Sequence, residues 1–176
     1  MTPATDCQAR DAPCATKLCR FASQEGCSTL TTMALLSDQD RQTVRGHLAA
    51  MTHPVRFLFF TQTIGAPETV TIARQVLDEL VSLDDRITVE EVNFVLERDR
   101  AVQYGVDAVP AIALLRDRDD TRMRFLGAPA GYEFMSLIES VILAGTDDSG
   151  LTASSKALIA EHVTEPRDIR VFVTPT

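Results

Sequence analysis

The amino-acid sequence predicts an α/β fold with a mixed sheet of four strands flanked by helices. The first indication is the run at residues 55–60, VRFLFF, which is apolar at consecutive positions, as in a strand buried on both faces. A helix with an apolar stripe and a second strand follow, in the order of a parallel crossover. Two further strands around a charged turn then lead into an amphipathic helix, which predicts an antiparallel pair beside the parallel one.

A helix should precede this first strand, over residues 38–51. Ser37 suits its N-cap position, and Asp40 stands three residues later, where an acidic side chain belongs in this kind of helix start. Residues 52–54, which include a proline, end the helix. One face of the helix would pack on the outside of the sheet through Val44, Leu48 and Met51.

The strand at residues 55–60 opens into a polar loop, and a helix over residues 68–82 follows. Pro67 suits the first helical turn, and Glu68 suits the positive end of the helix dipole. The apolar stripe of this helix consists of Val70, Ala73, Val76, Leu77 and Leu80. A strand over residues 87–94 and a short helix over residues 99–104 should come next, the latter ending at a glycine.

Residues 106–115 predict a third strand. Pro110 stands at its start, where the missing N–H of proline costs least. The segment 116–122 alternates positive and negative side chains and is expected to be a solvated turn. Across this turn, residues 122–126 should pair with the third strand in antiparallel orientation.

A final helix of this unit begins after a glycine-rich turn. Tyr132 and Phe134 are expected to anchor it to the sheet, and its stripe comprises Phe134, Leu137, Ile138, Val141 and Ile142. Beyond it, residues 146–150 are a polar connector. Residues 154–163 predict another helix, and residues 169–173 predict another strand.

Composition and charge exclude some classes of partner. The chain of 176 residues has a net charge of −8 and a pI near 4.8, so its field repels nucleic acid and anionic lipid. No apolar run approaches the ~20 residues that span a bilayer, and the N-terminus lacks the pattern of a secretory signal. We therefore expect no nucleic-acid partner, no membrane partner and a cytoplasmic location.

All four cysteines precede Met33. Cys7, Cys14, Cys19 and Cys27 show no Cys-x-x-Cys spacing, and no histidine lies among them. Three interpretations stay open for residues 1–32: a metal or redox appendage, a disordered tail, or a translation start placed too early, with the true start at Met33. The weak hydrophobic periodicity of this segment predicts disorder.

The loop after the first strand has the position of a redox site but carries no thiol. A helix N-terminus stabilises a thiolate, and one large class of folds places a Cys-x-x-Cys pair there. The corresponding residues here are Gly65, Ala66, Pro67, Glu68 and Thr69. A threonine hydroxyl forms no disulfide and is far less acidic than a thiol, so the loop is interpreted as a vestigial redox loop.

No other residues suggest a catalytic or metal centre. His47, His53 and His162 are scattered, without a serine or cysteine motif near any of them. The adjacent carboxylate pairs at residues 84–85, 90–91 and 147–148 fall in turns or on a strand, where neighbouring side chains point apart. We expect neither a metal nor a cofactor.

The order of elements resembles the thioredoxin and glutaredoxin fold, with Val109-Pro110 opening a strand and a strand-loop-helix junction after Phe60. More narrowly, residues 125–134, FLGAPAGYEF, resemble the segment before the last helix in the first half of glutaredoxin-like protein disulfide oxidoreductases, which are tandem thioredoxin-fold proteins. They are also similar to the N-terminal module of the alkyl hydroperoxide reductase flavoprotein. The resemblance covers about residues 33–176.

This resemblance implies a domain organisation and a binding site. Residues 33–145 would form a thioredoxin-like domain that lacks Cys-x-x-Cys. Residues 146–176 would form a linker helix and the first strand of an incomplete second thioredoxin-like domain, whose Cys-Pro-x-Cys would follow. The Val109-Pro110 bond would be cis and would lie against the loop at residues 65–68, with the backbone of Val109 binding an extended peptide.

The function that the resemblance implies is that of a redox-inactive first half of a protein disulfide oxidoreductase. Its partners would be a thiol-bearing thioredoxin-fold domain or a protein disulfide substrate.

Two interpretations of the C-terminal end of the sequence stay open. We prefer a truncated gene product, because an unpaired strand is an aggregation hazard; the other interpretation is a short protein whose last strand completes the sheet. The alternative function is a free-standing module that binds a peptide or partner without chemistry. A third hypothesis has the N-terminal cysteines supply thiols to the loop.

Overall fold

The computed structural model describes residues 36–146 and 148–173, and all of its elements belong to one unit, residues 32–176. The predicted disorder of residues 1–32 and the hypotheses about their cysteines lie outside the described residues.

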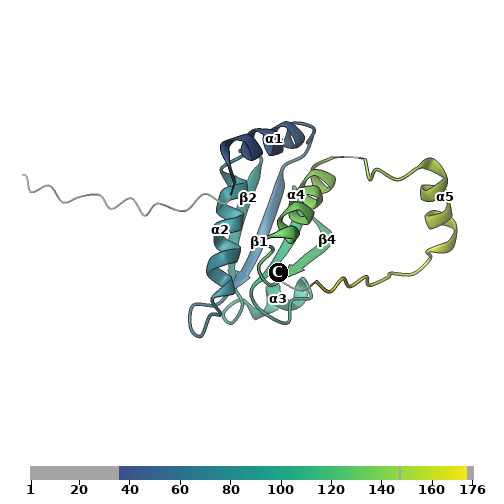
Figure 1. The fold of residues 1–176 in the computed structure, drawn as a ribbon. Coiled ribbons are helices and arrows are strands. Elements are labelled where there is room, and N and C mark those ends of the chain that lie inside the picture. Colours follow the sequence, from purple (N-terminus) through teal and green to yellow (C-terminus); the bar gives the residue numbers. More distant parts are fainter. Residues whose placement is uncertain (1–35, 147, 174–176) are drawn as a thin grey trace, which may run out of the picture. The chain divides into compact units, whose positions relative to one another are not determined.

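A mixed sheet of four strands, in the order β2-β1-β3-β4, forms the centre of the fold, as predicted (Figure 1). Its strands are β1 (Val55–Thr61), β2 (Ile87–Asn93), β3 (Ala111–Arg116) and β4 (Asp119–Leu126). The first two run parallel, with Val55 opposite Ile87, whereas β3 is antiparallel to both β1 and β4. Because Phe60 pairs with Ala111, the end of β1 lies beside the start of β3.

The hairpin between β3 and β4 is tighter than the sequence predicts. We expected residues 116–122 to form a solvated turn, but β4 already begins at Asp119, and the turn between the strands is two residues long. Asp117 turns the chain with a φ of 53°, and Asp119 pairs with Arg116. Alternating charge marks an exposed surface, and the exposed start of an edge strand satisfies that pattern as well as a turn does.

Helices pack on both faces of this sheet. They are α1 (Asp38–Leu48), α2 (Thr69–Val81), α3 (Arg98–Gln103) and α4 (Tyr132–Gly145). The predicted helix start at Ser37 is confirmed, because its Oγ accepts a hydrogen bond from the Asp40 backbone N–H at 3.2 Å. At the other end of the domain, the carbonyl of Gly145 accepts the N–H groups of Thr52 and His53 and so ties α4 to the segment before β1.

The core has two parts, one on each face of the sheet. On one face, α1, α2 and α4 cover Phe57 and Phe59 of β1. On the other, α3 covers Leu58 and Phe60. Strand β1 is therefore buried on both faces, as its consecutive apolar residues predicted.

The expected anchoring of α4 to the sheet holds for Phe134, which is buried, but Tyr132 is 87% exposed. Tyr132 lies two residues before the apolar stripe of α4 begins, which turns it away from the sheet.

After α4, a helix forms where the sequence predicts one. It is α5 (Ala153–His162), and Thr152 caps it by accepting from the Ser155 N–H.

The predicted strand at residues 169–173 is wrong: this segment has no strand, and its backbone makes no hydrogen bond to another described residue. Its apolar composition favours a strand, but a strand also requires a hydrogen-bonded neighbour. That residues 146–176 belong to a second domain stays a prediction.

No helix within the described ranges is long and apolar enough to cross a membrane.

Candidate functional site

The junction between β1 and α2 is an exposed loop that leads into a helix N-terminus. All side chains from Thr63 to Thr69 are exposed. Gly65 has a φ of 68°, and the Gln62 side chain donates to the Gly65 carbonyl at 3.1 Å, which folds the loop back on itself. The Pro67 carbonyl accepts the N–H of Val70 at 3.0 Å in the turn that leads into α2. We expected Pro67 in the first helical turn, but α2 begins at Thr69, so Pro67 stands just before the N-cap residue of the helix.

This helix N-terminus carries no thiol. Ala66 and Thr69 have the spacing of a Cys-x-x-Cys pair around Pro67 and Glu68, but neither contains sulfur. Glu68 is the N-cap residue of α2 and makes no side-chain capping bond. The positive end of the helix dipole, which would lower the pKa of a thiol here, therefore has no thiol to act on.

The Val109-Pro110 peptide bond is cis, as the resemblance implied. Pro110 is buried and Val109 is half-buried. The register places this bond at the same end of the sheet as the loop at residues 62–68: Phe60, one residue before the end of β1, pairs with Ala111, the residue that follows Pro110. The sequence therefore brings both parts of the candidate site to one end of the sheet. The binding role of Val109 stays a prediction.

The backbone next to this bond is left without partners. Residues 107–109 make no backbone hydrogen bond to any described residue. On either side of them the backbone is held: the Val106 N–H donates to the Ala101 carbonyl at 2.8 Å, and the Pro110 carbonyl accepts from the Gly127 N–H at 2.8 Å. Backbone N–H and C=O groups without partners beside a sheet are the groups with which a protein can bind the backbone of an extended peptide.

Exposed apolar side chains occur in the loops at the same end of the sheet. We call Ile64, Leu126 and Tyr132 the apolar rim; they are 90%, 65% and 87% exposed. Ile64 follows β1, Leu126 ends β4 opposite Ala111, and Tyr132 begins α4. Sequence reasoning did not assign these residues to the site. An apolar residue directly beside a glycine near the beginning or end of an element, as at 64–65, 126–127 and 131–132, is the signal that could have indicated them.

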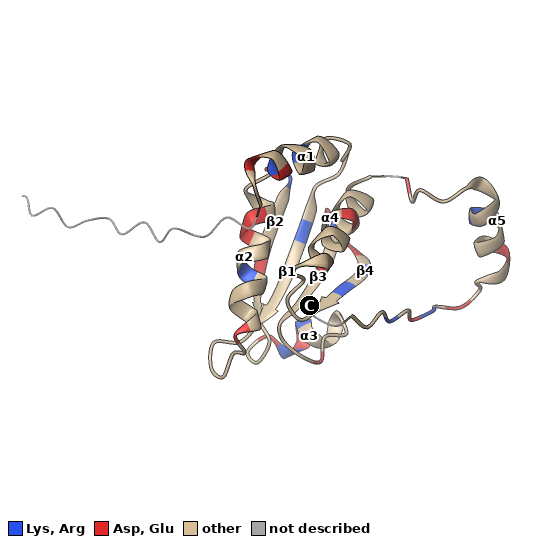
Figure 2. Ribbon diagram, in the orientation of Figure 1, with Lys and Arg blue, Asp and Glu red and all other residues tan. Residues whose placement is uncertain are grey.

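Ion pairs around α3 have a structural role. Arg100 contacts Glu90 at 2.7 Å and Glu97 at 3.0 Å, and Glu90 also contacts Arg56 at 3.5 Å. A hydrogen bond from the Asn93 N–H, with help from Arg100, holds the pKa of the Glu97 carboxyl below its usual range. Figure 2 shows acidic and basic residues mixed on helices and strands alike. Such pairs join β1, β2 and α3 and offer no group poised for proton transfer.

The histidines lie in other places. His47 is in the last turn of α1, and His162 is in the last turn of α5. His53 lies before β1, with its Nδ1 3.4 Å from an Asp117 carboxylate oxygen. Within the described ranges, no three His, Cys, Asp or Glu side chains are placed to hold a metal ion.

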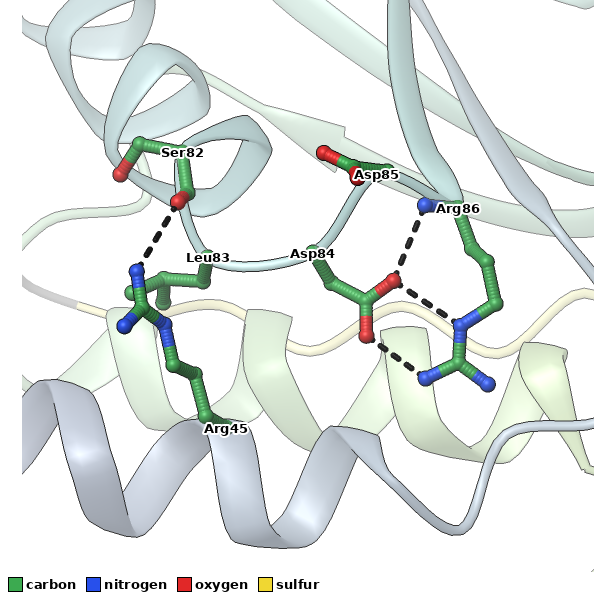
Figure 3. A pocket seen from close by; sticks show the side chains of 6 residues that line it. All are labelled: Arg45, Ser82, Leu83, Asp84, Asp85 and Arg86. Carbon is green, nitrogen blue, oxygen red and sulfur yellow. Dashed lines mark hydrogen bonds and ion pairs between the residues drawn. The ribbon is translucent and has the colours of Figure 1, made fainter.

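A hollow at the opposite end of the sheet is structural. Its lining consists of Arg45 and residues 82–86, from the turn between α2 and β2 (Figure 3). Both carboxylate oxygens of Asp84 bind Arg86, which also donates to the backbone carbonyls of Leu48 and Met51. The hydrogen bond from Arg86 lowers the pKa of Asp84 below its ordinary value. These polar groups satisfy one another and tie α1 to the start of β2.

Comparison with known sequences identifies relatives of part of the chain. No protein-family model matches it. It is 37% identical over 68 residues to a probable thioredoxin of Methanothermobacter thermautotrophicus, a match that covers 38% of this chain and 74% of that protein. A probable thioredoxin of Methanothermobacter marburgensis is 36% identical over 72 residues, which are 79% of its length.

Solved structures extend the likeness to most of the domain. The alkylhydroperoxide reductase protein AhpF of Enterococcus faecalis superposes with a TM-score of 0.66 at 29% identity, over 71% of this chain and 60% of that chain. Its separately solved N-terminal domain gives 0.65 at 30% identity. A protein disulfide oxidoreductase from Aeropyrum pernix gives 0.60 at 24% identity and shares the fold, over 70% of this chain and 53% of that chain.

The chain thus spans about three fifths of the AhpF structure, and about three quarters of the probable thioredoxin. The sequence match, the mixed sheet and the cis-proline at the start of β3 agree with one another. This chain belongs to the thioredoxin-like family.

Proposed function

We propose that this chain acts as a thiol-free thioredoxin-fold unit, corresponding to the first half of a glutaredoxin-like protein disulfide oxidoreductase. In this role it binds an extended polypeptide and presents it to a thiol-bearing thioredoxin-fold unit. One observation carries the proposal: the Val109-Pro110 edge is present, with unpaired backbone beside it, whereas the loop at residues 65–69 has no cysteine.

The likeness to AhpF supports a place within a larger redox assembly. This chain resembles the N-terminal domain of that reductase, at 30% identity, and spans 60% of it. A unit that covers part of such a domain would contribute binding and geometry, and another unit would contribute chemistry. The probable thioredoxins support the redox character of the family to which the unit belongs.

In the proposed mechanism, the described residues bind and the partner unit reacts. The N–H and C=O of Val109 pair with the backbone of an extended segment that carries a disulfide, and the apolar rim covers its apolar side chains. A thiolate of the partner unit attacks one sulfur of that disulfide and forms a mixed disulfide, and the other sulfur leaves as a thiolate. A second thiol of the partner then displaces the substrate, so that the partner ends oxidised and the substrate reduced.

The test is to restore the thiols to the loop. In a full chain in which Cys7, Cys14, Cys19 and Cys27 are replaced by serine, reduction of insulin disulfides by dithiothreitol should proceed at the uncatalysed rate. Adding Ala66→Cys and Thr69→Cys creates the order Cys-Pro-Glu-Cys at the start of α2. We expect the rate of insulin reduction to rise at least roughly tenfold, equivalent to about 1.4 kcal/mol of barrier.

A second cysteine pair provides the matched control. Thr152→Cys and Ser155→Cys have the same spacing and lie at the N-terminus of α5, a helix without the sequence context of the β1–α2 junction. They should give little more than the uncatalysed rate. Equal rates for the two pairs would show that the loop is not a vestigial thioredoxin site. Catalysis by the chain without any cysteine would contradict the proposal that it is redox-inactive.

A further inference from the structure

Arg124 of β4 has a guanidinium group that is engaged on every side. Its Nε donates to the Tyr104 carbonyl at 2.9 Å, and its two terminal nitrogens donate to both carboxylate oxygens of Asp120, at 2.8 and 2.6 Å. One of these nitrogens also donates to the Met123 carbonyl. The guanidinium carbon lies 5.5 Å from the centre of the Tyr104 ring, within the range of a cation–π contact. The side chain is 19% exposed, so these contacts hold it in one orientation.

Tyr104 begins the segment that ends at the cis-proline. It is the C-cap residue of α3, and the buried Val106 follows after a glycine. At the far end, the N–H of Gly127 donates to the Pro110 carbonyl. Strand β4 and the residue after it therefore hold the segment 104–110 at both ends, and the unpaired backbone of Val109 lies between the two attachment points.

The same tyrosine also reaches the strand that leads into the vestigial redox loop. Its ring centre lies 6.1 Å from that of Phe60, at an interplanar angle of 54°. Phe60 is fully buried and stands two residues before Gln62, where the loop starts. Arg124 thus fixes a residue that contacts both halves of the candidate site.

Lysine cannot reproduce these contacts. A lysine ammonium has one nitrogen at the end of a flexible stem, and it lacks the Nε donor and the planar group of arginine. It would keep the positive charge near Asp120 but would lose either the bond to the Tyr104 carbonyl or the bidentate carboxylate contact. Arg124→Lys therefore keeps the positive charge at this position and removes the specific geometry of the guanidinium contacts.

We propose that Arg124 is a positioning residue for the peptide-binding edge, holding the Tyr104 end of the segment so that the Val109 backbone stays in register for an extended substrate. The inference rests on the proposed function, because the register of Val109 affects activity only if the substrate binds there.

The matched control is Arg74→Lys. Arg74 of α2 also lies over an aromatic ring of β1, 5.4 Å from the centre of Phe59, and contacts a carboxylate of Glu91 at 2.6 Å. These contacts lie on the other face of the sheet, where Phe59 packs, and they involve elements other than segment 104–110. Both substitutions keep the positive charge and remove a guanidinium that lies near an aromatic ring and a carboxylate, but only Arg124 contacts segment 104–110.

The first measurement is backbone order by nitrogen-15 relaxation on the full chain. Arg124→Lys should lower the order parameters of residues 107–109 from about 0.85 to below about 0.6, whereas Arg74→Lys should leave them unchanged. The second measurement uses the chain with Ala66→Cys and Thr69→Cys. There, Arg124→Lys should raise the KM for insulin about fivefold and change kcat less than about twofold, because the reacting thiols are untouched.

Three results would overturn the inference: unchanged order parameters in Arg124→Lys, an equal loss of order in Arg74→Lys, or a looser segment with an unchanged KM. If the chain with restored thiols is inactive, the proposed function is refuted instead. The order parameters of residues 107–109 then still decide whether Arg124 holds the segment.

Discussion

Two glycine-to-alanine substitutions in this domain should have opposite effects on stability. Gly145 ends α4 and packs against Met51, which is 3% exposed. A Cβ at residue 145 would lie 2.7 Å from both Cγ and Cε of Met51 and 3.1 Å from its Cβ. Gly46 lies within α1, and a Cβ there would meet nothing within 4 Å.

The expected magnitudes follow from these contacts. Overpacking of a core position costs about 1–3 kcal/mol, because the buried Met51 side chain has to shift away from the added Cβ. Alanine recovers part of this through its better helix propensity, at most ~1 kcal/mol at a helix end. We therefore expect Gly145→Ala to destabilise the domain by about 1–2 kcal/mol. Gly46→Ala has the propensity gain without the clash and should stabilise it by about 0.5–1 kcal/mol.

Urea unfolding followed by circular dichroism measures both changes, and thermal unfolding should show about 4 °C per kcal/mol. Combining Gly145→Ala with Met51→Ala tests the cause, since truncating Met51 removes the two contacts at 2.7 Å and leaves only the 3.1 Å contact with its Cβ. The double variant should then be no less stable than Met51→Ala alone. A Gly145→Ala domain as stable as the unmodified one would refute the packing argument, as would a destabilisation that persists unchanged in the Met51→Ala background.

Three further changes should be measurable by the same unfolding experiment. The hydrogen bond from Arg86 holds the Asp84 pKa below its ordinary value of 3.8. The stability that this carboxylate contributes is therefore present above that pH and is lost as the pH falls through the lower pKa of the folded state. Asp84→Asn should be less stable at pH 7 and should lose less stability than the unmodified domain on acidification from pH 5 to 2.5. Arg41→Met leaves the buried Glu79 carboxylate, now 2.7 Å from Arg41, without its cation and should cost about 3–5 kcal/mol, most of which Glu79→Leu should restore in the double variant. Ser37→Ala removes the cap of α1 and should cost about 1 kcal/mol, with Ser37→Thr close to neutral.

The parts of the fold that depend on local patterns could be predicted from the sequence. The consecutive apolar residues of β1 predicted a strand buried on both faces, and Ser37 with Asp40 predicted the start of α1. The resemblance, and not a local pattern, implied the cis bond at Val109-Pro110. The signals for β1 and α1 lie within a few residues of the features that they specify.

Features that depend on distant residues were not predictable in this way. The segment 169–173 has the composition of a strand, but pairing depends on a neighbour that composition does not reveal. The role inferred for Arg124 depends on Tyr104, twenty residues away, which only the register of β3 and β4 brings close. The exposure of Tyr132 depends on where the stripe of α4 begins, a boundary that periodicity fixes only to within a turn.

The complete exposure of residues 63–69 means that the fold and the chemistry of this protein can change independently. None of these side chains is part of the core, so substitutions of them should change the stability of the fold little. Substitutions of the buried residues of β1 should destabilise it. Two substitutions separate this loop from one with a thiol pair, and neither intermediate should unfold the domain. A chain with this loop can therefore gain or lose a thiol pair through two successive substitutions, and the same exposure makes the loop a suitable place to graft a different motif.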